Sequence, residues 1–221
     1  RLYYQNLSSY SKILNQRNNL LKQIRFQNNL IDTLEAWDIQ LVKYGSEVIK
    51  YREKFIKHLG EVCQKIHNKL TGGKEQILLE YDRNVGYDSY LTELKKKRQK
   101  DLKYSTTTVG PHRDDLLFSI GDVDIRKYGS QGQQRTVALS LKMAEIKLVK
   151  RIINDNPILL LDDVMSELDT SRRDALIEEI KDIQTIITCT GYDDFVKEQV
   201  IINNVYRVVE GTATRVRTEE A

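Results

Sequence analysis

The sequence predicts an α/β protein in which an antiparallel helical hairpin, residues 1–73, precedes a mixed sheet with helices, residues 74–221. Two observations lead to this prediction. Apolar residues in the first part recur at alternating intervals of three and four, as on one face of a helix. In the second part, short apolar runs alternate with helical patterns, and the run at 158–161 ends in two aspartates, as a buried parallel strand would.

Composition and charge exclude several classes of protein. With 40% hydrophobic and 30% charged residues among 221, the chain has the composition of a soluble globular protein of one or two domains. Its net charge of +3 means that any nucleic-acid surface must be a local patch. Cys63 and Cys189 lie far apart without a CxxC pair, which favours a reducing cytosol and argues against zinc.

No segment reads as a membrane span or a secretory signal. The longest apolar runs fall well short of the roughly 20 residues that a transmembrane helix needs. The chain begins without Met, in what reads as the middle of a helix, so we expect a fragment of a longer protein.

Residues 1–73 are predicted to form the hairpin arm. Arg17 is the only break in the apolar seam of the first helix, and Asn28-Asn29 interrupts the pattern. Asp32 with Glu35 is a capping-box signature for a longer second helix, which Gly72-Gly73 ends. Because the connection is short, the two helices should lie antiparallel. The arm is either an ordinary helical subdomain or an extension that reaches a partner or DNA.

The next stretch is predicted to contain a strand and a helix with a basic face. Residues 76–82 alternate as a short strand, and Asp88 is placed to cap a helix whose leucines face inward. The cations on its outer face are Lys95, Lys96, Lys97, Arg98, Lys100 and Lys103. Such a run is either a solvated face or a contact for DNA phosphates. It has no interleaved aromatic residues, which argues against base stacking on single strands.

A Thr-rich segment, 105–109, is expected to be a strand that leads into a turn at 110–115. A strand at 116–120 and a hairpin through Gly121-Asp122 to a strand at 123–126 should follow. His112 lies in the turn with no nucleophile or metal ligand at useful spacing. It is therefore more readily explained as a turn residue bonded to backbone than as a catalyst.

Two linked motifs follow. Ser130 with Gln133 is a capping box, so a helix should begin there with N–H groups and a positive dipole end that suit a phosphate. The run at 158–161 should deliver Asp162 and Asp163 to a sheet edge, where carboxylates hold Mg²⁺ beside a phosphate chain. Each motif alone also fits a helix start or a core strand without function. Together, with a helix between them, they are more specific.

The remaining elements complete the predicted sheet and its helices. The first motif should open a helix from 131 to about 152, and a second helix is expected at 172–183. Residues 185–190 should return as a parallel strand, and 205–216 should form a terminal hairpin.

Three stretches together resemble a known family. Residues 108–116 read Thr-Val-Gly-Pro-His-Arg-Asp-Asp-Leu, 130–136 read Ser-Gln-Gly-Gln-Gln-Arg-Thr, and 159–169 read Leu-Leu-Leu-Asp-Asp-Val-Met-Ser-Glu-Leu-Asp. The last two resemble the signature motif, Walker B motif and D-loop of SMC-like ABC-type ATPases, and the three together resemble the RecF family of bacterial recombination mediators. The resemblance implies that 74–221 is the C-terminal lobe of an ABC/SMC-like ATPase head. The chain has no GxxxxGK[ST] loop, so we expect the family's phosphate-cradling loop to precede Arg1.

The resemblance also implies nucleotide contacts. Two chains would enclose two ATP molecules, and each chain would contact the γ-phosphate of the nucleotide held by the other. The signature residues that would make this contact are Ser130, Gln131, Gly132 and Gln133. Ser166 and Asp169 would belong to the D-loop at the dimer seam.

The implied catalytic groups differ from the usual ones. Asp162 would order Mg²⁺ through water, and Asp163 stands where ABC ATPases usually carry the Glu that positions the attacking water. Thr190 takes the position of the usual switch His. A shorter carboxylate and a hydroxyl should activate water poorly, which implies slow hydrolysis.

The function that the resemblance implies is ATP-dependent dimerisation and binding to double-stranded DNA near single-strand junctions. This would help load RecA in DNA repair with RecR and RecO, in a bacterial cytoplasm, with links to DNA replication and the SOS response. We expect the fragment alone to be inactive. The alternatives are a non-enzymatic fragment that binds a partner protein, a transporter nucleotide-binding subunit, or another ABC/SMC-like head.

Overall fold

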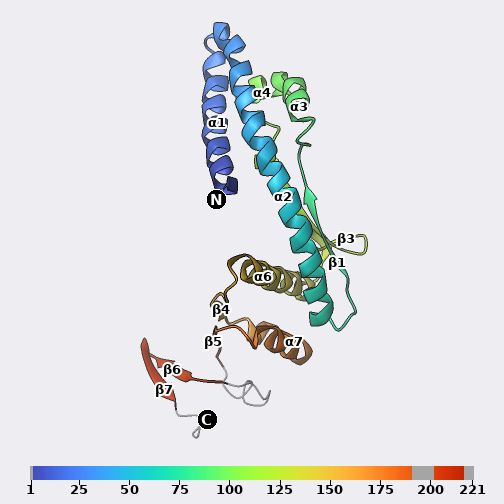
Figure 1. Cartoon of the computed structure of the whole chain (residues 1–221), viewed down its shortest axis with the longest axis vertical. Coiled ribbons are helices and arrows are strands. Elements are labelled where there is room, and N and C mark those ends of the chain that lie inside the picture. The colour runs from blue at the N-terminus through green and yellow to red at the C-terminus, as the bar shows by residue number, and fades with distance from the viewer. Residues whose placement is uncertain (1, 191–201, 217–221) are drawn as a thin grey trace.

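The computed structural model describes residues 2–190 and 202–216, and it confirms the predicted α/β class. The molecule is elongated, with the helical arm at one end and small sheets at the other (Figure 1). Its α-helices are α1 (Leu2–Ile24), α2 (Leu34–Leu70), α3 (Tyr90–Lys96), α4 (Arg98–Tyr104), α5 (Ile125–Tyr128), α6 (Gln131–Ile153) and α7 (Thr170–Ile180). Its strands are β1 (Ile77–Asp82), β2 (Asp115–Ile120), β3 (Val123–Asp124), β4 (Leu159–Asp162), β5 (Thr185–Thr188), β6 (Val205–Val209) and β7 (Thr212–Val216). Short 3-10 helices are η1 (Asn28–Thr33), η2 (Pro111–Arg113) and η3 (Met165–Glu167).

The arm is the predicted antiparallel hairpin. α1 lies along the first half of α2, and residues of the predicted seam such as Tyr10, Leu41 and Val48 are buried between them (Figure 1). The capping box expected from Asp32 and Glu35 is wrong. The 3-10 helix η1 runs directly into α2, and the N-cap Thr33 makes no side-chain cap hydrogen bond. A helix that continues an existing turn has fewer unpaired N–H groups for a cap to satisfy.

Arg17, the break in the seam, is the centre of a buried ion-pair network. Its Nε lies 2.7 Å from Asp38 of α2, and its Nη1 lies 2.8 Å from Asp101 of α4. All three side chains are fully buried. Asp38 also pairs with Arg98 at 2.8 Å. The network ties α1, α2 and α4 together, because buried charges require paired, hydrogen-bonded partners.

The helix expected after Asp88 is two short helices, and Asp88 does not cap it. α3 has Ser89 as its N-cap, without a side-chain cap hydrogen bond. The helix is interrupted at Lys97, which lies between α3 and α4. The strand expected at 105–109 is also wrong. The Thr107 backbone N–H donates to Asn18 Oδ1 at 2.8 Å, and the Thr108 N–H donates to Asp101 Oδ1 at 2.9 Å. These backbone donors bond side chains of α1 and α4, so they are not available for a strand ladder.

The first sheet packs on the second half of α2. β1 pairs antiparallel with β2, and β2 with β3, which confirms the strands predicted at 76–82 and 116–120. Ile77 and Leu79 of β1 are buried in one core with Leu59, Cys63 and residues of α6. The strand predicted at 123–126 is shorter than expected. Asp124 accepts a hydrogen bond from the Arg126 N–H at 3.0 Å, and this cap starts the helix α5.

The second sheet has two parallel strands, β4 and β5, as predicted. The expectation of a fully buried strand is wrong. Leu161 is 6% exposed, but its neighbour Leu160 is 69% exposed, together with Ile158 and Ile186. A strand that is buried on both faces needs a second covering layer, and in the described part of the chain only one face is covered. β5 ends at Thr188, short of the predicted residue 190.

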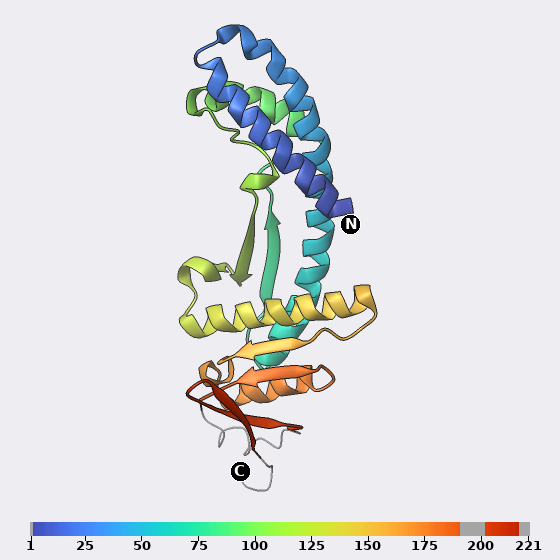
Figure 2. The same cartoon turned by 90° about the vertical axis from the view of Figure 1, so that its left-hand side faces the viewer.

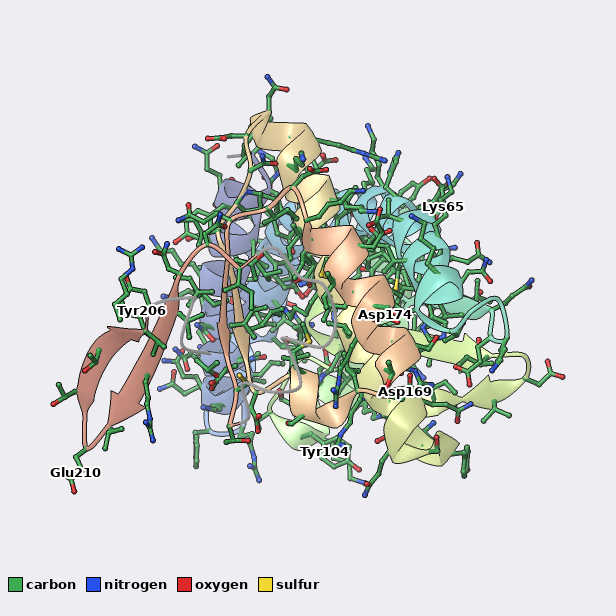
Figure 3. The ribbon with its side chains drawn as sticks, turned by 90° about the horizontal axis from the view of Figure 1, so that it is seen from below. Lys65, Tyr104, Asp169, Asp174, Tyr206 and Glu210 are labelled. Atoms are coloured by element: carbon green, nitrogen blue, oxygen red, sulfur yellow. The ribbon has the colours of Figure 1, made fainter. Side chains whose placement is uncertain are left out.

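The last described element is the predicted hairpin of β6 and β7. It turns through Glu210 and Gly211, which both have positive φ. Figure 3 shows the hairpin projecting to one side, with Glu210 at its tip. Of the described helices, none combines the length and apolar character needed to cross a membrane.

α2 belongs to both ends of the molecule. With 37 residues it is about 55 Å long. Its first half lies in the arm core with α1, and its second half lies in the core shared with α6, β1 and α7. The division of the chain at residue 73 stays a prediction.

Candidate functional site

Ser130 begins α6 with the predicted capping box. Its Oγ accepts a hydrogen bond from the Gln133 N–H at 3.2 Å, and Gln133 Oε1 accepts one from the Ser130 N–H at 3.0 Å. Ser130, Gln131 and Gly132 are exposed, so the positive end of the helix dipole faces solvent. A Cβ at Gly132 would meet nothing closer than Ser130 Oγ at 4.0 Å. The chain therefore leaves open space at a helix start that suits an anion.

A partly buried network that sequence reasoning missed supports this helix start. Gln133 Nε2 donates to Glu75 Oε1 at 3.0 Å, and Glu75 Oε2 lies 3.3 Å from Nε2 of His67 in the last turns of α2. His67 Nδ1 in turn lies 3.0 Å from Ser140 Oγ of α6. Burial lowers the pKa of His67, and the Glu75 carboxylate opposes this shift. No spacing in the sequence relates Glu75 to Gln133, so only the fold brings them together.

The two aspartates lie at the end of β4, where the parallel strand β5 also ends. Thr188 Oγ1 donates to Asp162 Oδ1 at 2.5 Å and accepts from the Asp163 N–H at 3.1 Å. Both carboxylates are exposed. Asp163 has a φ of 51°, a left-handed conformation that is uncommon for a residue with a side chain. Thr188 is thus the hydroxyl that orients Asp162, and within the described part of the chain no hydrogen bond joins the predicted Thr190 to the two aspartates.

The segment after the aspartates continues the same surface. Ser166 Oγ donates to the Asp163 carbonyl at 2.8 Å. Asp169 caps α7 by accepting from the Arg172 N–H at 2.9 Å, and the two side chains pair at 2.8 Å. Arg172 also lowers the pKa of buried His67 through its charge. α7 also packs against α2, whose base supports the start of α6.

The two motifs open on one side of the molecule. Figure 2 shows that α6 begins where β4 and β5 end, because the chain reverses direction between α6 and β4. In Figure 3, Asp169 lies at the outer end of α7 on this side. The residues that line it are exposed rather than sealed in the core. The surface therefore presents a helix dipole and hydroxyls at one place and carboxylates at another.

The carboxylates fit Mg²⁺ in one particular way. The described residues contain no group of three or more His, Cys, Asp or Glu side chains arranged to hold a metal. Mg²⁺ in phosphate-transfer sites is commonly held by one or two carboxylates plus the substrate phosphates, so such a group is not required. Asp162, with Oδ1 fixed by Thr188, suits that mode.

The predicted basic run lies on α3 and α4, which pack beside the arm and away from these motifs (Figure 1). Lys95 pairs with Glu35 at 3.0 Å and Lys96 with Glu93 at 2.6 Å. The Arg98 guanidinium is turned to Asp38. The exposed members for which the structure gives no ion pair within residues 2–190 and 202–216 are Lys97, Lys100 and Lys103.

His112 bonds the Thr107 carbonyl through Nε2 at 3.0 Å, as expected for a turn residue, and also the Tyr10 hydroxyl at 2.6 Å.

Comparison with known proteins confirms the predicted resemblance, although no family model matches the chain. The "DNA replication and repair protein RecF" of Agathobacter rectalis is 54% identical over 211 residues, which cover 96% of this chain and 58% of that protein. The RecF of Acetivibrio thermocellus is 42% identical over 222 residues, 96% of this chain and 60% of that protein. A solved structure described as "the recombination mediator protein RecF-ATP in RecFOR pathway" superimposes with a TM-score of 0.84 at 31% identity, over 97% of this chain and 58% of that one. The chain thus spans about 58–60% of the length of these relatives.

Proposed function

Because this chain resembles RecF proteins over nearly its whole length, we propose that it supplies one half of an ATP site in a RecF-type DNA repair protein. The observation that carries the proposal is the start of α6, where a closed capping box leaves Ser130, Gln131 and Gly132 exposed. Within the described chain, no atom lies closer than 4.0 Å to a Cβ placed on Gly132. This open space would let a phosphate approach the backbone closely. The other half of the site, a phosphate-cradling loop, would come from residues outside these 221.

Each site residue has a proposed role. Ser130 to Gln133 would bind the γ-phosphate of an ATP held by a second copy of the protein. The Ser130 hydroxyl would donate a hydrogen bond to that phosphate. Asp162 would hold Mg²⁺ and Asp163 would position the attacking water. Ser166 and Asp169 would lie at the seam between copies, and Thr190 would take the switch position. Asp163 is one methylene shorter than the usual Glu, which supports slow hydrolysis.

The relatives support a proposed cellular role. The solved RecF structure is described as bound to ATP in the RecFOR pathway. The complete protein would dimerise with ATP, bind double-stranded DNA near single-strand junctions and help load RecA with RecR and RecO in the bacterial cytoplasm, including during DNA replication and the SOS response. For DNA, Lys97, Lys100 and Lys103 are the better candidates, because Lys95, Lys96 and Arg98 already pair with carboxylates. Each neutralised phosphate would add salt-sensitive affinity.

Substitution of Ser130 in the complete RecF-type protein tests the proposal. Ser130→Arg places a long cation where the γ-phosphate would sit and should abolish ATP-dependent dimerisation, measured by sedimentation with and without ATP-Mg²⁺. Ser89→Arg is the matched control, since Ser89 is the exposed N-cap of α3, and this variant should leave dimerisation unchanged. ATP-dependent dimers of normal stability with Ser130→Arg would refute the proposal.

A second candidate is a non-enzymatic fragment that binds a partner protein. The sequence favours it in one respect, since no GxxxxGK[ST] loop occurs in the chain. Titration of the 221-residue chain with ATP tests whether the phosphate loop lies outside it. We expect weak or no binding and no hydrolysis, and tight binding would contradict our placing of the loop outside the chain.

A further inference from the structure

We propose that Glu75 is a positioning residue that holds the start of α6 in its ligand-binding form. This inference rests on the proposed function, because it concerns the same nucleotide contact. It assigns a role to a side chain that belongs to none of the motifs. The role is to fix the orientation of the Gln133 amide, and through it the backbone at Ser130.

The Gln133 amide makes two different hydrogen bonds. Its oxygen accepts from the Ser130 N–H at 3.0 Å and its nitrogen donates to Glu75 Oε1 at 3.0 Å. An amide has one accepting end and one donating end, so the two neighbours together specify which way it points. If the amide turned over, its oxygen would face the Glu75 carboxylate, and two acceptors would repel each other. Glu75 therefore selects the orientation that closes the capping box.

The closed box determines what α6 offers to a ligand. The Gln133 side chain occupies the Ser130 N–H, and Ser130 Oγ occupies the Gln133 N–H. The N–H groups of Gln131 and Gly132 have no intrahelical acceptor, because they belong to the first helical turn. Without Glu75, the Gln133 side chain would gain rotational freedom and the box would open part of the time. The phosphate contact would then have to restore this order at the expense of affinity.

Glu75 is itself held by the base of the arm. The chain reverses after α2 through Gly72 and Gly73, whose φ values are 59° and 79°. This turn brings Glu75 back to His67, with its Oε2 3.3 Å from His67 Nε2. The Glu75 side chain is 21% exposed and His67 is fully buried. The carboxylate thus bridges the last turns of α2 and the first turn of α6.

Substitutions in the complete RecF-type protein test this role through the ATP concentration that gives half-maximal dimerisation. Glu75→Ala should raise this concentration about tenfold, the scale expected for one hydrogen bond to a charged group. Glu75→Gln keeps an acceptor at the same reach and should lie near the wild type, whereas Glu75→Asp is one methylene shorter and should resemble Glu75→Ala. Glu80→Ala, an exposed acid on β1, is the matched control and should have no effect.

A double-variant cycle distinguishes positioning from general destabilisation. If Glu75 acts through Gln133, the pair Glu75→Ala and Gln133→Ala should be no worse than Gln133→Ala alone. Additive losses, or a Glu75→Asp variant equal to the wild type, would overturn the inference even if Glu75→Ala fails to fold. Ser130→Arg run in parallel separates the two claims. If it abolishes dimerisation while the Glu75 variants have no effect, only the positioning role fails, and if Ser130→Arg has no effect, the proposed function fails.

Discussion

His112 shows how a residue in a functional motif serves the fold. Its Nε2–H donates to the Thr107 carbonyl, so Nδ1 is left as an acceptor for the Tyr10 hydroxyl. Both bonds suit the neutral imidazole. Burial lowers the pKa of His112 below its ordinary value of 6.5, and neighbouring Arg113 adds to the shift, although the Thr107 bond opposes it. The histidine thus binds α1 to the turn before β2.

This pKa shift predicts a pH dependence of stability. The unfolded chain takes up a proton on His112 near pH 6.5 but the folded chain does so only at lower pH, so stability is full above about pH 6.5 and falls as the pH drops below it. The free energy of unfolding from urea titrations should be lower at pH 5.5 than at 7.5. His112→Gln should make this difference smaller, with His67, shifted in the same direction, responsible for the remainder. An unchanged difference in the variant would rule out His112 as a source.

Arg17 gives a second prediction at this scale. Arg17→Met should reduce the free energy of unfolding by about 3 kcal/mol, because removing one member of a buried ion-pair network leaves charged partners without compensation. Urea unfolding measures this loss. Arg25→Met, at an exposed position directly after α1, should change stability by less than about 0.5 kcal/mol. A loss below about 1 kcal/mol for Arg17→Met would show that the network adds little.

Residue patterns in the sequence predicted only those side-chain hydrogen bonds whose partners lie close together along the chain. The Ser130–Gln133 box is visible because both partners lie within one turn. Glu75 and Thr188 lie 58 and 26 residues from their partners Gln133 and Asp162, and no spacing rule relates them. Arg17 was recognised as a break in the apolar seam, but its carboxylate partners follow only from how α4 folds back on the arm.

At the scale of elements, periodic patterns predicted helices well and the Thr-rich segment badly. α1, α2 and α6 each present a long repeating apolar face, which tertiary packing preserves. Residues 105–109 have strand-forming composition, yet Asn18 and Asp101 provide acceptors for their backbone N–H groups. Strand propensity depends on a neighbouring strand that is available to pair, and this segment has none among the described residues.

Helix packing in the arm predicts the effect of adding volume at Gly45. A Cβ there would lie 2.6 Å from Tyr90 Cε1 of α3 and 3.0 Å from Tyr10 Cε2 of α1. Gly45→Leu should therefore destabilise the protein by about 1–3 kcal/mol, since overpacking forces the helices apart. Thermal or urea unfolding measures the change. Gln40→Leu, exposed on the same helix, is the control, and equal stabilities of the two variants would contradict the close packing of the three helices.

At the scale of the whole molecule, α2 connects the arm to the candidate site. One helix runs from the tip of the arm to His67 and the turn before Glu75, and both motifs open beside its base (Figure 2). The sequence predicted the hairpin, the two motifs and the parallel strand pair. It did not predict that one face of β4 and β5, with Ile158, Leu160 and Ile186, is exposed, because an apolar run does not reveal which layers cover it.

The central claim is that each copy of the complete protein supplies part of a site that a second copy completes. Mixing two inactive variants of the RecF-type protein tests it most directly. Ser130→Arg would damage the phosphate contact and Asp163→Asn the water-positioning carboxylate, so each variant alone should have almost no ATPase activity. If the halves come from different copies, every mixed dimer contains one intact site that can still close on ATP, so an equal mixture should recover ATPase activity, at most about a quarter of the wild-type rate with random pairing. A mixture as inactive as its components would contradict the account.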